Sequence, residues 1–257
     1  MAVARTITLA DAEIARIGLG TNRLRNAPQN VELIGQAVAG GIGMVDTAYT
    51  YTDGDSEALI GEALSRRPDG LVVATKGGYY PGTGSPEALS AQIEESLRRL
   101  RTDAIDLYYL HRVDPETPLE ESLGAIAAHR DRGQLRHVGL SEVGIEQLER
   151  GRQVVPIAAV QNRYNLAERT HEEVVDHCAE QGIAFVPFFP LHGLDSRPVA
   201  EIAARHGATP QQVALAWLLA RSPAMLPIPG TLSLEHLEQN LSALDLELSH
   251  DELEALR

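Results

Sequence analysis

The chain has 257 residues, 44% of them hydrophobic and only 4% aromatic, a length that suits one α/β barrel with an aliphatic core. Its formal net charge of −14 and its lack of any basic block argue against nucleic acid and anionic membrane as partners. Residues 1–16 contain no apolar signal segment, no apolar run approaches the roughly 18 residues of a membrane span, and Cys178 is the only cysteine. We therefore expect a cytoplasmic protein that is a monomer or a weak homo-oligomer.

The first residues predict a short hairpin outside the main architecture, with strands at 6–9 and 12–16. One unit then repeats: a β-like run ends in a polar residue, Gly or Pro, and a loop and a helix-period segment follow. The runs end near Gly20, Asp46, Lys76, His111, Ser141, Gln161, Pro190 and Pro229. Helical signals cover 31–39, 57–64, 87–100, 119–130, 145–150, 171–181 and 211–220. Eight such runs favour a (β/α)8 TIM barrel, with residues 1–257 forming a single domain.

Capping residues support several of these helices. Ser85 before Pro86 is an expected N-cap with proline in the first helical position, and Thr209 with Gln212 forms an expected capping box. Gly133 and Gly182 are expected just past the ends of two helices. Ser249 is expected to begin a last short helix.

Polar side chains stand where the predicted barrel strands end, which is the end that carries the chemistry in this fold. Asp46, Lys76 and His111 each close an apolar run, and Tyr51 follows Asp46 by five residues. Taken singly, Asp46 could cap a turn, Tyr51 could be an exposed loop tyrosine, and His111 could be a satisfied barrel-end histidine. Lys76 is the only lysine in a chain whose other fixed cations are all arginine. As a set, the four residues favour a catalytic site.

These residues resemble the motifs of the aldo-keto reductase superfamily. Asp46 to Tyr51, Ser56-Glu57 and the segment Ile60 to Leu64 are similar to the first signature of that family, and Lys76 and His111 match the rest of its catalytic tetrad. The resemblance covers nearly the whole chain and is nearest to the bacterial NADPH-dependent aldehyde reductases, including pyridoxal-reductase-like members. It implies a barrel enzyme that reduces a small-molecule carbonyl substrate with NADPH, with NADH as a possible alternative.

The implied roles agree with the chemistry of the four side chains. A free phenol has a pKa of about 10, too high for an efficient general acid at neutral pH, and a neighbouring ammonium stabilises the phenolate. Asp46 is expected to pair with Lys76, and neutral His111 is expected to orient the substrate oxygen. Tyr51 is expected to protonate that oxygen as hydride reaches the carbon.

The resemblance also implies a set of cofactor contacts. Ser141 and Gln161 are expected to hold the nicotinamide carboxamide, although Glu142 replaces an Asn that the family often has after that Ser. Phe188 is expected to stack on the nicotinamide ring. At the adenosine end Gly230 replaces a Lys and His236 an Arg that often binds the 2′-phosphate. The full expected set is Gly20, Thr21, Asn22, Asp46, Ser141, Gln161, Phe188, Leu191, Gly193, Gly230, Thr231, His236, Gln239 and Asn240.

The substrate pocket is expected to be open and shallow, because the connection from Pro190 to the helix near Val199 is short. Tyrosines at 49, 79, 80 and 164 are candidates to line it, and Arg112 and Arg163 are candidates to meet an anionic substrate. No metal site is expected, since neighbouring residues such as His177 and Cys178 point about 100° apart on a helix.

Two other functions are compatible with the same barrel. Lys76 could form a Schiff base in an aldolase-like lyase, which borohydride trapping would reveal. Alternatively, the barrel could sense NADPH for a partner without catalysis.

Overall fold

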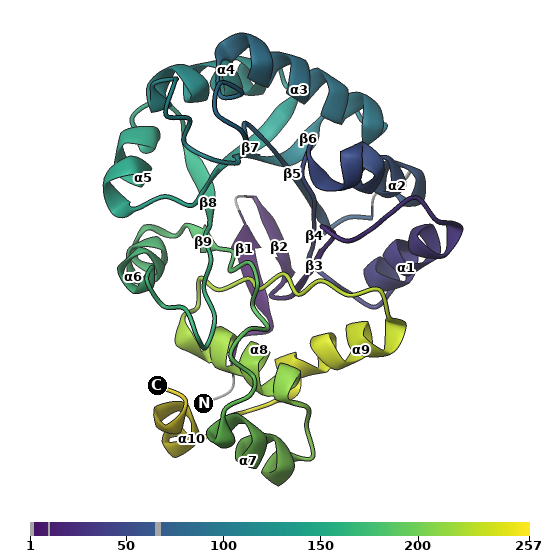
Figure 1. Ribbon diagram of the computed structural model, residues 1–257, viewed down its shortest axis with the longest axis vertical. Coiled ribbons are helices and arrows are strands. Elements are labelled where there is room, and N and C mark those ends of the chain that lie inside the picture. Colours follow the sequence, from purple (N-terminus) through teal and green to yellow (C-terminus); the bar gives the residue numbers. More distant parts are fainter. Residues whose placement is uncertain (1–2, 10, 65–67) are drawn as a thin grey trace.

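A parallel sheet of seven strands curls into a barrel in the computed structural model, which describes residues 3–9, 11–64 and 68–257 (Figure 1). The strands pair in chain order, each parallel to the next, so the carboxyl ends of all of them lie at one end of the barrel. The predicted alternation of strands and helices is confirmed. The strands are β3 (Gly18–Gly20), β4 (Met44–Asp46), β5 (Val72–Gly77), β6 (Ile105–Leu110), β7 (Leu135–Ser141), β8 (Ile157–Gln161) and β9 (Ala184–Phe185).

An extended segment, residues 224–230, occupies the eighth position and closes the barrel. Isolated bridges join Met225 to Phe185 of β9 and Gly230 to Gly20 of β3, and the amides of Gly18 and Gly20 donate to carbonyls of this segment. The segment forms no regular ladder because Pro227 and Pro229 have no N–H to donate. The predicted eighth run therefore exists, but it pairs irregularly. The run expected to end near Pro190 pairs in a regular ladder only as far as Phe185.

Helices surround the barrel and cover its outer face (Figure 1). They are α1 (Pro28–Ala39), α2 (Asp55–Ala63), α3 (Pro86–Arg99), α4 (Leu119–Asp131), α5 (Ile145–Arg152), α6 (Glu172–Gln181), α7 (Arg197–His206), α8 (Pro210–Arg221), α9 (Leu234–Ser242) and α10 (His250–Ala255), with short 3-10 turns η1 (Tyr51–Gly54) and η2 (Ala243–Asp245). The predicted caps are confirmed: Ser85 accepts from the Ala88 amide, and Thr209 and Gln212 form a capping box. Gly133 and Gly182 adopt left-handed conformations.

The predicted N-terminal hairpin lies against the amino ends of the strands. Its strands β1 (Thr6–Leu9) and β2 (Ala12–Ala15) are antiparallel. Ala15 packs so closely on Gly43, just before β4, that a Cβ there would lie 2.2 Å from its carbonyl oxygen. Leu9 and Ile14 belong to the hydrophobic cluster of barrel strand side chains, so the hairpin closes the bottom of that core.

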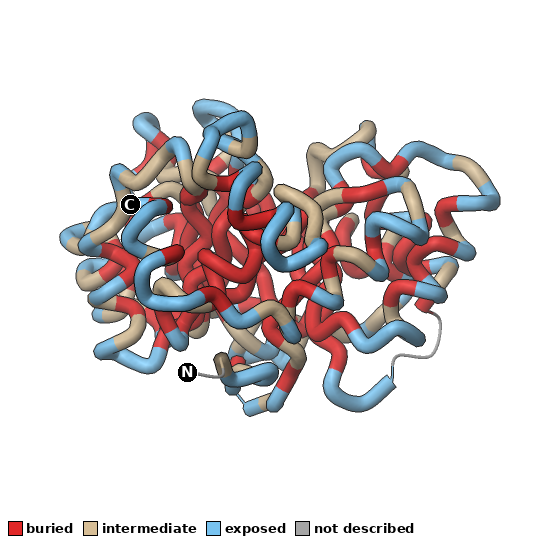
Figure 2. The backbone as a smooth tube through the Cα atoms, turned by 90° about the horizontal axis from the view of Figure 1, so that it is seen from below, coloured by how far each residue is buried: buried red, intermediate tan, exposed pale blue. Residues whose placement is uncertain are grey.

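Buried residues concentrate on the strands, and the outer turns of the helices are exposed (Figure 2). One hydrophobic cluster consists mainly of side chains between the strands and the helices, and a smaller one unites the hairpin with the barrel strands. This layered core holds the strand ends in fixed positions. Within the described residues, no helix combines the length and the apolarity that crossing a lipid bilayer requires.

Candidate active site

The four predicted catalytic residues meet at the carboxyl end of the barrel. Asp46 is the last residue of β4, Lys76 lies one residue before the end of β5, and His111 directly follows β6. Because these strands are neighbours and parallel, their ends bring the side chains to one place. Tyr51 begins the short turn η1 after β4.

Lys76 is held from three sides and has no exposed surface. Its Nζ atom donates to Oδ1 of Asp46 at 2.6 Å, to the Thr47 carbonyl at 2.7 Å and to Oη of Tyr51 at 3.4 Å. The second carboxylate oxygen of Asp46 accepts from the side-chain amide of Gln161 at 2.9 Å. Every hydrogen-bonding direction of the ammonium is therefore used, and its position beside Tyr51 is fixed.

Each charge of this pair favours the ionised form of the other. Burial lowers the pKa of Lys76, but the neighbouring Asp46 carboxylate outweighs it and holds that pKa above its ordinary value. Burial raises the pKa of Asp46, against the opposing charge of Lys76 and the hydrogen bonds from Lys76 and Gln161. Lys76 is thus a permanent cation in a site of low polarity, where its field acts strongly on the Tyr51 oxygen.

The turn that presents Tyr51 has an uncommon backbone. Thr52, Asp53 and Gly54 follow one another with φ values of 48°, 56° and 94°. Left-handed conformations are costly for residues with a Cβ and persist only where surrounding contacts impose them. Here the Thr52 hydroxyl donates to the Leu24 carbonyl at 2.7 Å, which anchors the turn to the loop after β3. This turn directs the phenol of Tyr51 toward Lys76.

His111 completes the group as a neutral imidazole. Burial, then the charges of Lys76 and Arg112, lower its pKa to about 2. Its ring lies 6.1 Å from that of Tyr51, edge to face, and 4.7 Å from that of Tyr79. Its Nδ1 atom is buried and has no hydrogen-bond partner among the described residues. A neutral ring in this position can donate one N–H to an oxygen placed near the Tyr51 hydroxyl.

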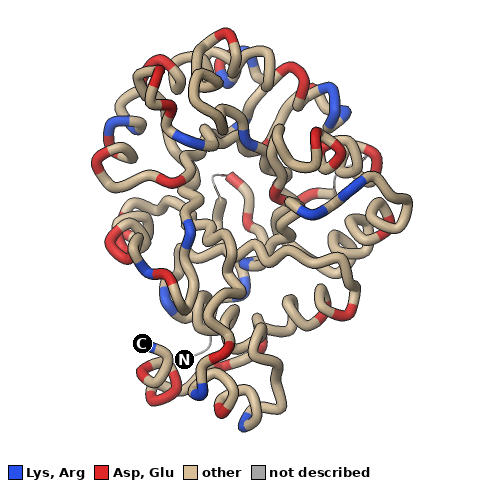
Figure 3. The backbone as a smooth tube through the Cα atoms, in the orientation of Figure 1, with Lys and Arg blue, Asp and Glu red and all other residues tan. Residues whose placement is uncertain are grey.

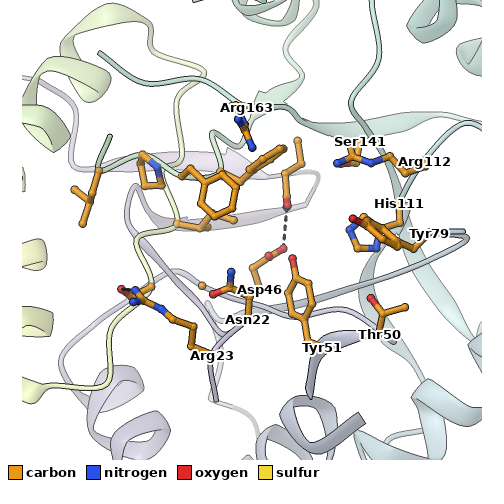
Figure 4. A pocket seen from close by; sticks show the side chains of 18 of the residues that line it. Asn22, Arg23, Asp46, Thr50, Tyr51, Tyr79, His111, Arg112, Ser141 and Arg163 are labelled. Carbon is orange, nitrogen blue, oxygen red and sulfur yellow. Dashed lines mark hydrogen bonds between the residues drawn. The ribbon is translucent and has the colours of Figure 1, made fainter. Parts of the chain in front are cut away.

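A cavity of about 700 Å³ opens above these residues (Figure 4). Many of the residues expected from the sequence line it: Gly20, Asn22, Asp46, Tyr51, His111, Ser141, Gln161, Phe188, Leu191 and Gly230. They come from the strand ends or following loops at seven of the barrel positions, so only the fold brings them together. Sequence reasoning missed Arg23, Phe189 and His192, which also line the cavity. The position of Arg23 in the sequence was a usable signal, since it follows β3, the first strand of the barrel, by three residues.

Other predicted residues lie outside the cavity. Lys76 lies behind Tyr51, and Thr21 is buried below the floor, where its hydroxyl bonds the Asp46 carbonyl at 2.8 Å. Gly193 lines a second, separate hollow. The remaining ones lie in or just before α9, whose N-cap Ser233 accepts from the His236 amide: Thr231, His236, Gln239 and Asn240.

The cavity has the features that a flat amide-bearing ring and a phosphate chain need. A Cβ at Gly20 would lie 2.7 Å from the Ile228 carbonyl oxygen, so the chain passes very closely there. Phe188 offers an aromatic side wall, and the Gln161 amide stands at the base with one N–H taken by Asp46. Arg23 stands beside Gly230 and donates to its carbonyl at 3.0 Å. These residues fit a nicotinamide dinucleotide.

The candidate substrate-pocket residues divide into two groups. Tyr79, Tyr80, Arg112 and Arg163 line the cavity. Tyr49 packs under Arg99, whose guanidinium lies 4.6 Å from its ring centre, and Tyr164 is fully buried with its hydroxyl on Glu172. No group of three His, Cys, Asp or Glu side chains suited to a metal occurs in the part of the chain that the structure describes.

Comparisons with known proteins agree with this geometry. A model of the Aldo/keto reductase family matches residues 16–197 and 194–257. Pyridoxine 4-dehydrogenase of Escherichia coli is 36% identical over 276 residues, which cover 98% of this chain and 96% of that protein. An uncharacterized oxidoreductase of Schizosaccharomyces pombe is 36% identical over 269 residues, or 96% and 87% of the two chains. An aldo-keto reductase from Klebsiella pneumoniae, solved in complex with NADPH, superposes with a TM-score of 0.90 at 31% identity over 99% of this chain and 94% of that one.

Proposed function

The chain belongs to the aldo/keto reductase family and is an NADP-dependent oxidoreductase that acts on carbonyl groups, and we propose that it reduces an aldehyde or ketone to the alcohol with a proton from Tyr51. The observation that carries the proposal is the contact between the Lys76 ammonium and the Tyr51 hydroxyl, 3.4 Å apart. His111 lies beside that hydroxyl on the wall of the same cavity.

Each residue has a defined task in this proposal. The carbonyl oxygen binds between the Tyr51 hydroxyl and the His111 ring, and the imidazole N–H orients it. When bound, the reduced nicotinamide supplies hydride to the carbonyl carbon. Negative charge then develops on the oxygen, Tyr51 donates its proton, and the Lys76 ammonium stabilises the phenolate that is left. Asp46, itself held by the Gln161 amide, binds the Lys76 ammonium and fixes the position of that side chain.

We propose NADPH as the preferred reductant, with the 2′-phosphate bound near the start of α9. His236 lies in the first turn of that helix, next to Glu235, and the N-terminal amides of a helix attract phosphate. We also propose an aldehyde as the substrate, pyridoxal being the first to test because the Escherichia coli relative is a pyridoxine 4-dehydrogenase.

We further propose that the protein acts in a reducing, cytoplasmic environment. Cys178, its only cysteine, is buried, and burial raises the pKa of its thiol to about 12. Such a thiol is rarely ionised at neutral pH and is poorly suited to disulfide chemistry.

The two alternatives find less support in the site. An amine that forms a Schiff base must be free and neutral, whereas the Lys76 nitrogen donates three hydrogen bonds and is fully buried. A module that only senses NADPH has no need of a tyrosine, a histidine and an ion pair around one cavity.

The decisive assay follows NADPH oxidation with a panel of aldehydes that includes pyridoxal. Tyr51→Phe is expected to lower turnover about a hundredfold or more, since a positioned general acid contributes that much. Tyr49→Phe is the matched control, because this tyrosine lies two residues away but packs under Arg99 rather than lining the cavity. Equal turnover in the two variants would refute the mechanism. Substrate trapped on Lys76 by borohydride, without any effect of NADPH, would favour the lyase instead.

A further inference from the structure

The cavity is rich in positive charge although the chain as a whole is strongly acidic. Figure 3 shows that most acidic segments lie on the outer helices, and the net charge is −14. Three arginines line the cavity: Arg23, Arg112 and Arg163. Arg23 donates to Gly230 on the side where the cofactor chain is expected. The other two lie on the opposite side from Tyr51 in Figure 4 and have no task in the proposed reaction.

Arg112 directly follows His111 and is poised beside the reacting group. Its amide donates to the Gly78 carbonyl at 3.1 Å, which anchors the backbone. Its guanidinium lies 5.8 Å from the ring centre of Tyr79, and that ring lies 4.7 Å from His111. Tyr79 is therefore a close neighbour of both the Arg112 guanidinium and the His111 ring.

The hydrogen-bonding capacity of Arg112 is not used up. One terminal nitrogen is buried without a hydrogen-bond partner among the described residues, and its nearest carboxylate, Glu142, is 3.5 Å away. The other carboxylate oxygen of Glu142 already accepts a hydrogen bond from the Arg163 amide at 2.7 Å. The backbone of Glu142 is left-handed, with φ of 55°. The contact keeps the guanidinium in place, and because the Arg112 side chain is 36% exposed, other parts of it stay accessible to a ligand.

Arg163 adds a second cation on the same side of the cavity. Its guanidinium lies over the rings of Phe188 and Phe189, at 5.8 and 5.0 Å, and it forms no ion pair with any residue that the structure describes. The two arginines carry two positive charges against the single charge of Glu142. This side of the cavity therefore has an excess of positive charge that attracts an anion.

We propose that Arg112, assisted by Arg163, binds a carboxylate carried by the carbonyl substrate, on the opposite side of the cavity from Tyr51 (Figure 4). A guanidinium offers two parallel N–H groups that match a carboxylate, and partial burial strengthens the contact. Glu142 lowers the affinity of Arg112 for the substrate carboxylate, because it pairs with the same guanidinium. This inference rests on the proposed function, because it names the class of substrate that the same site takes.

The test compares 4-carboxybenzaldehyde with its methyl ester, two aldehydes that share their ring and carbonyl but differ in charge. In the wild-type protein, kcat/KM is expected to favour the carboxylate. Arg112→Gln is expected to lower kcat/KM for the carboxylate about ten- to hundredfold, mostly through KM, and to leave the ester nearly unchanged. Arg163→Gln is expected to act in the same direction but less strongly, and Glu142→Gln in the opposite one. Arg150→Gln, in an exposed pair with Glu120, is the matched control.

A binding measurement separates this inference from the proposed function. Calorimetric titration with 4-(hydroxymethyl)benzoate, in the presence of NADPH, does not depend on turnover, because an alcohol cannot pass hydride to the reduced cofactor. The inference predicts binding to the wild-type protein that weakens about tenfold or more in Arg112→Gln, whether or not the aldehydes are reduced. Equal affinity of the two proteins, or equal loss for the carboxylate and the ester, would overturn it. Failure to reduce any aldehyde, with this difference in binding intact, would instead refute the proposed function.

Discussion

The ammonium of Lys76 and the carboxylate of Asp46 lie 2.6 Å apart, and neither side chain is exposed to solvent by more than 2%. A buried ion pair is a costly arrangement, and breaking it by removing one partner is usually more costly still. Here the pair fixes a positive charge beside the Tyr51 hydroxyl. The stability of the barrel end and the acidity of the tyrosine therefore depend on the same two residues.

Lys76→Met is expected to lower both the stability of the protein and its turnover. The variant leaves Asp46 buried without its partner, which costs about 3–5 kcal/mol of unfolding free energy, and it removes the charge that stabilises the phenolate, which costs about a hundredfold or more in turnover. The double variant Lys76→Met/Asp46→Asn is expected to recover most of the stability but not the turnover. Urea denaturation and steady-state kinetics measure the two effects, and near-normal turnover in the double variant would contradict the role of the cation.

His111 is expected to make stability depend on pH. Its pKa is about 2 in the folded chain but about 6.5 when unfolded, so below pH 6.5 the unfolded chain binds a proton that the folded chain does not. The stability contributed by burying the neutral ring is present above pH 6.5 and is lost as the pH falls, by up to about 1.4 kcal/mol per pH unit. Unfolding free energies from pH 5 to 7 should show a shallower slope for His111→Gln than for the wild-type protein. Parallel slopes would mean that the ring titrates normally.

Arg16 is expected to be a main support of the barrel closure. This fully buried guanidinium donates to the carbonyls of Met225, Leu219 and Ser222, and burial lowers its pKa to about 10. Arg16→Met removes these three hydrogen bonds and is expected to cost about 3 kcal/mol or more, since each hydrogen bond to a charged group contributes about 1.5–3 kcal/mol. Thermal and urea unfolding would show the loss. Arg98→Met, at an exposed position of α3, should change neither midpoint measurably.

His236→Arg is expected to strengthen the preference for NADPH over NADH. A guanidinium keeps its charge at every pH used, whereas an imidazole binds phosphate well only when it is protonated. Fluorescence titrations at pH 6 and pH 8 should give a tighter dissociation constant for NADPH in the variant, with a larger gain at pH 8 and little change for NADH. An equal gain for both nucleotides would place the 2′-phosphate elsewhere.

The order of elements and the positions of the reactive groups were accessible from the sequence. Alternation of apolar runs and helix-period segments predicts a barrel because buried parallel strands and amphipathic helices have different periods. Asp46, Lys76 and His111 stood out because a buried strand seldom ends in an ionisable residue without a reason. The caps at Ser85 and Thr209 depend only on local backbone chemistry, and they were found where expected.

What the tertiary structure decided is how those groups share their hydrogen bonds and charges. Tyr49 and Tyr51 cannot be told apart by their local sequence, since both are tyrosines of one loop. In the structure, the left-handed turn at Thr52 directs Tyr51 into the cavity, whereas Tyr49 packs under the guanidinium of Arg99, outside it. The Gln161 amide donates to Asp46, and three arginines line the same cavity: Arg23, Arg112 and Arg163. In both cases the residues lie far apart along the chain. Such contacts depend on distances between loops, which packing sets and local sequence does not encode.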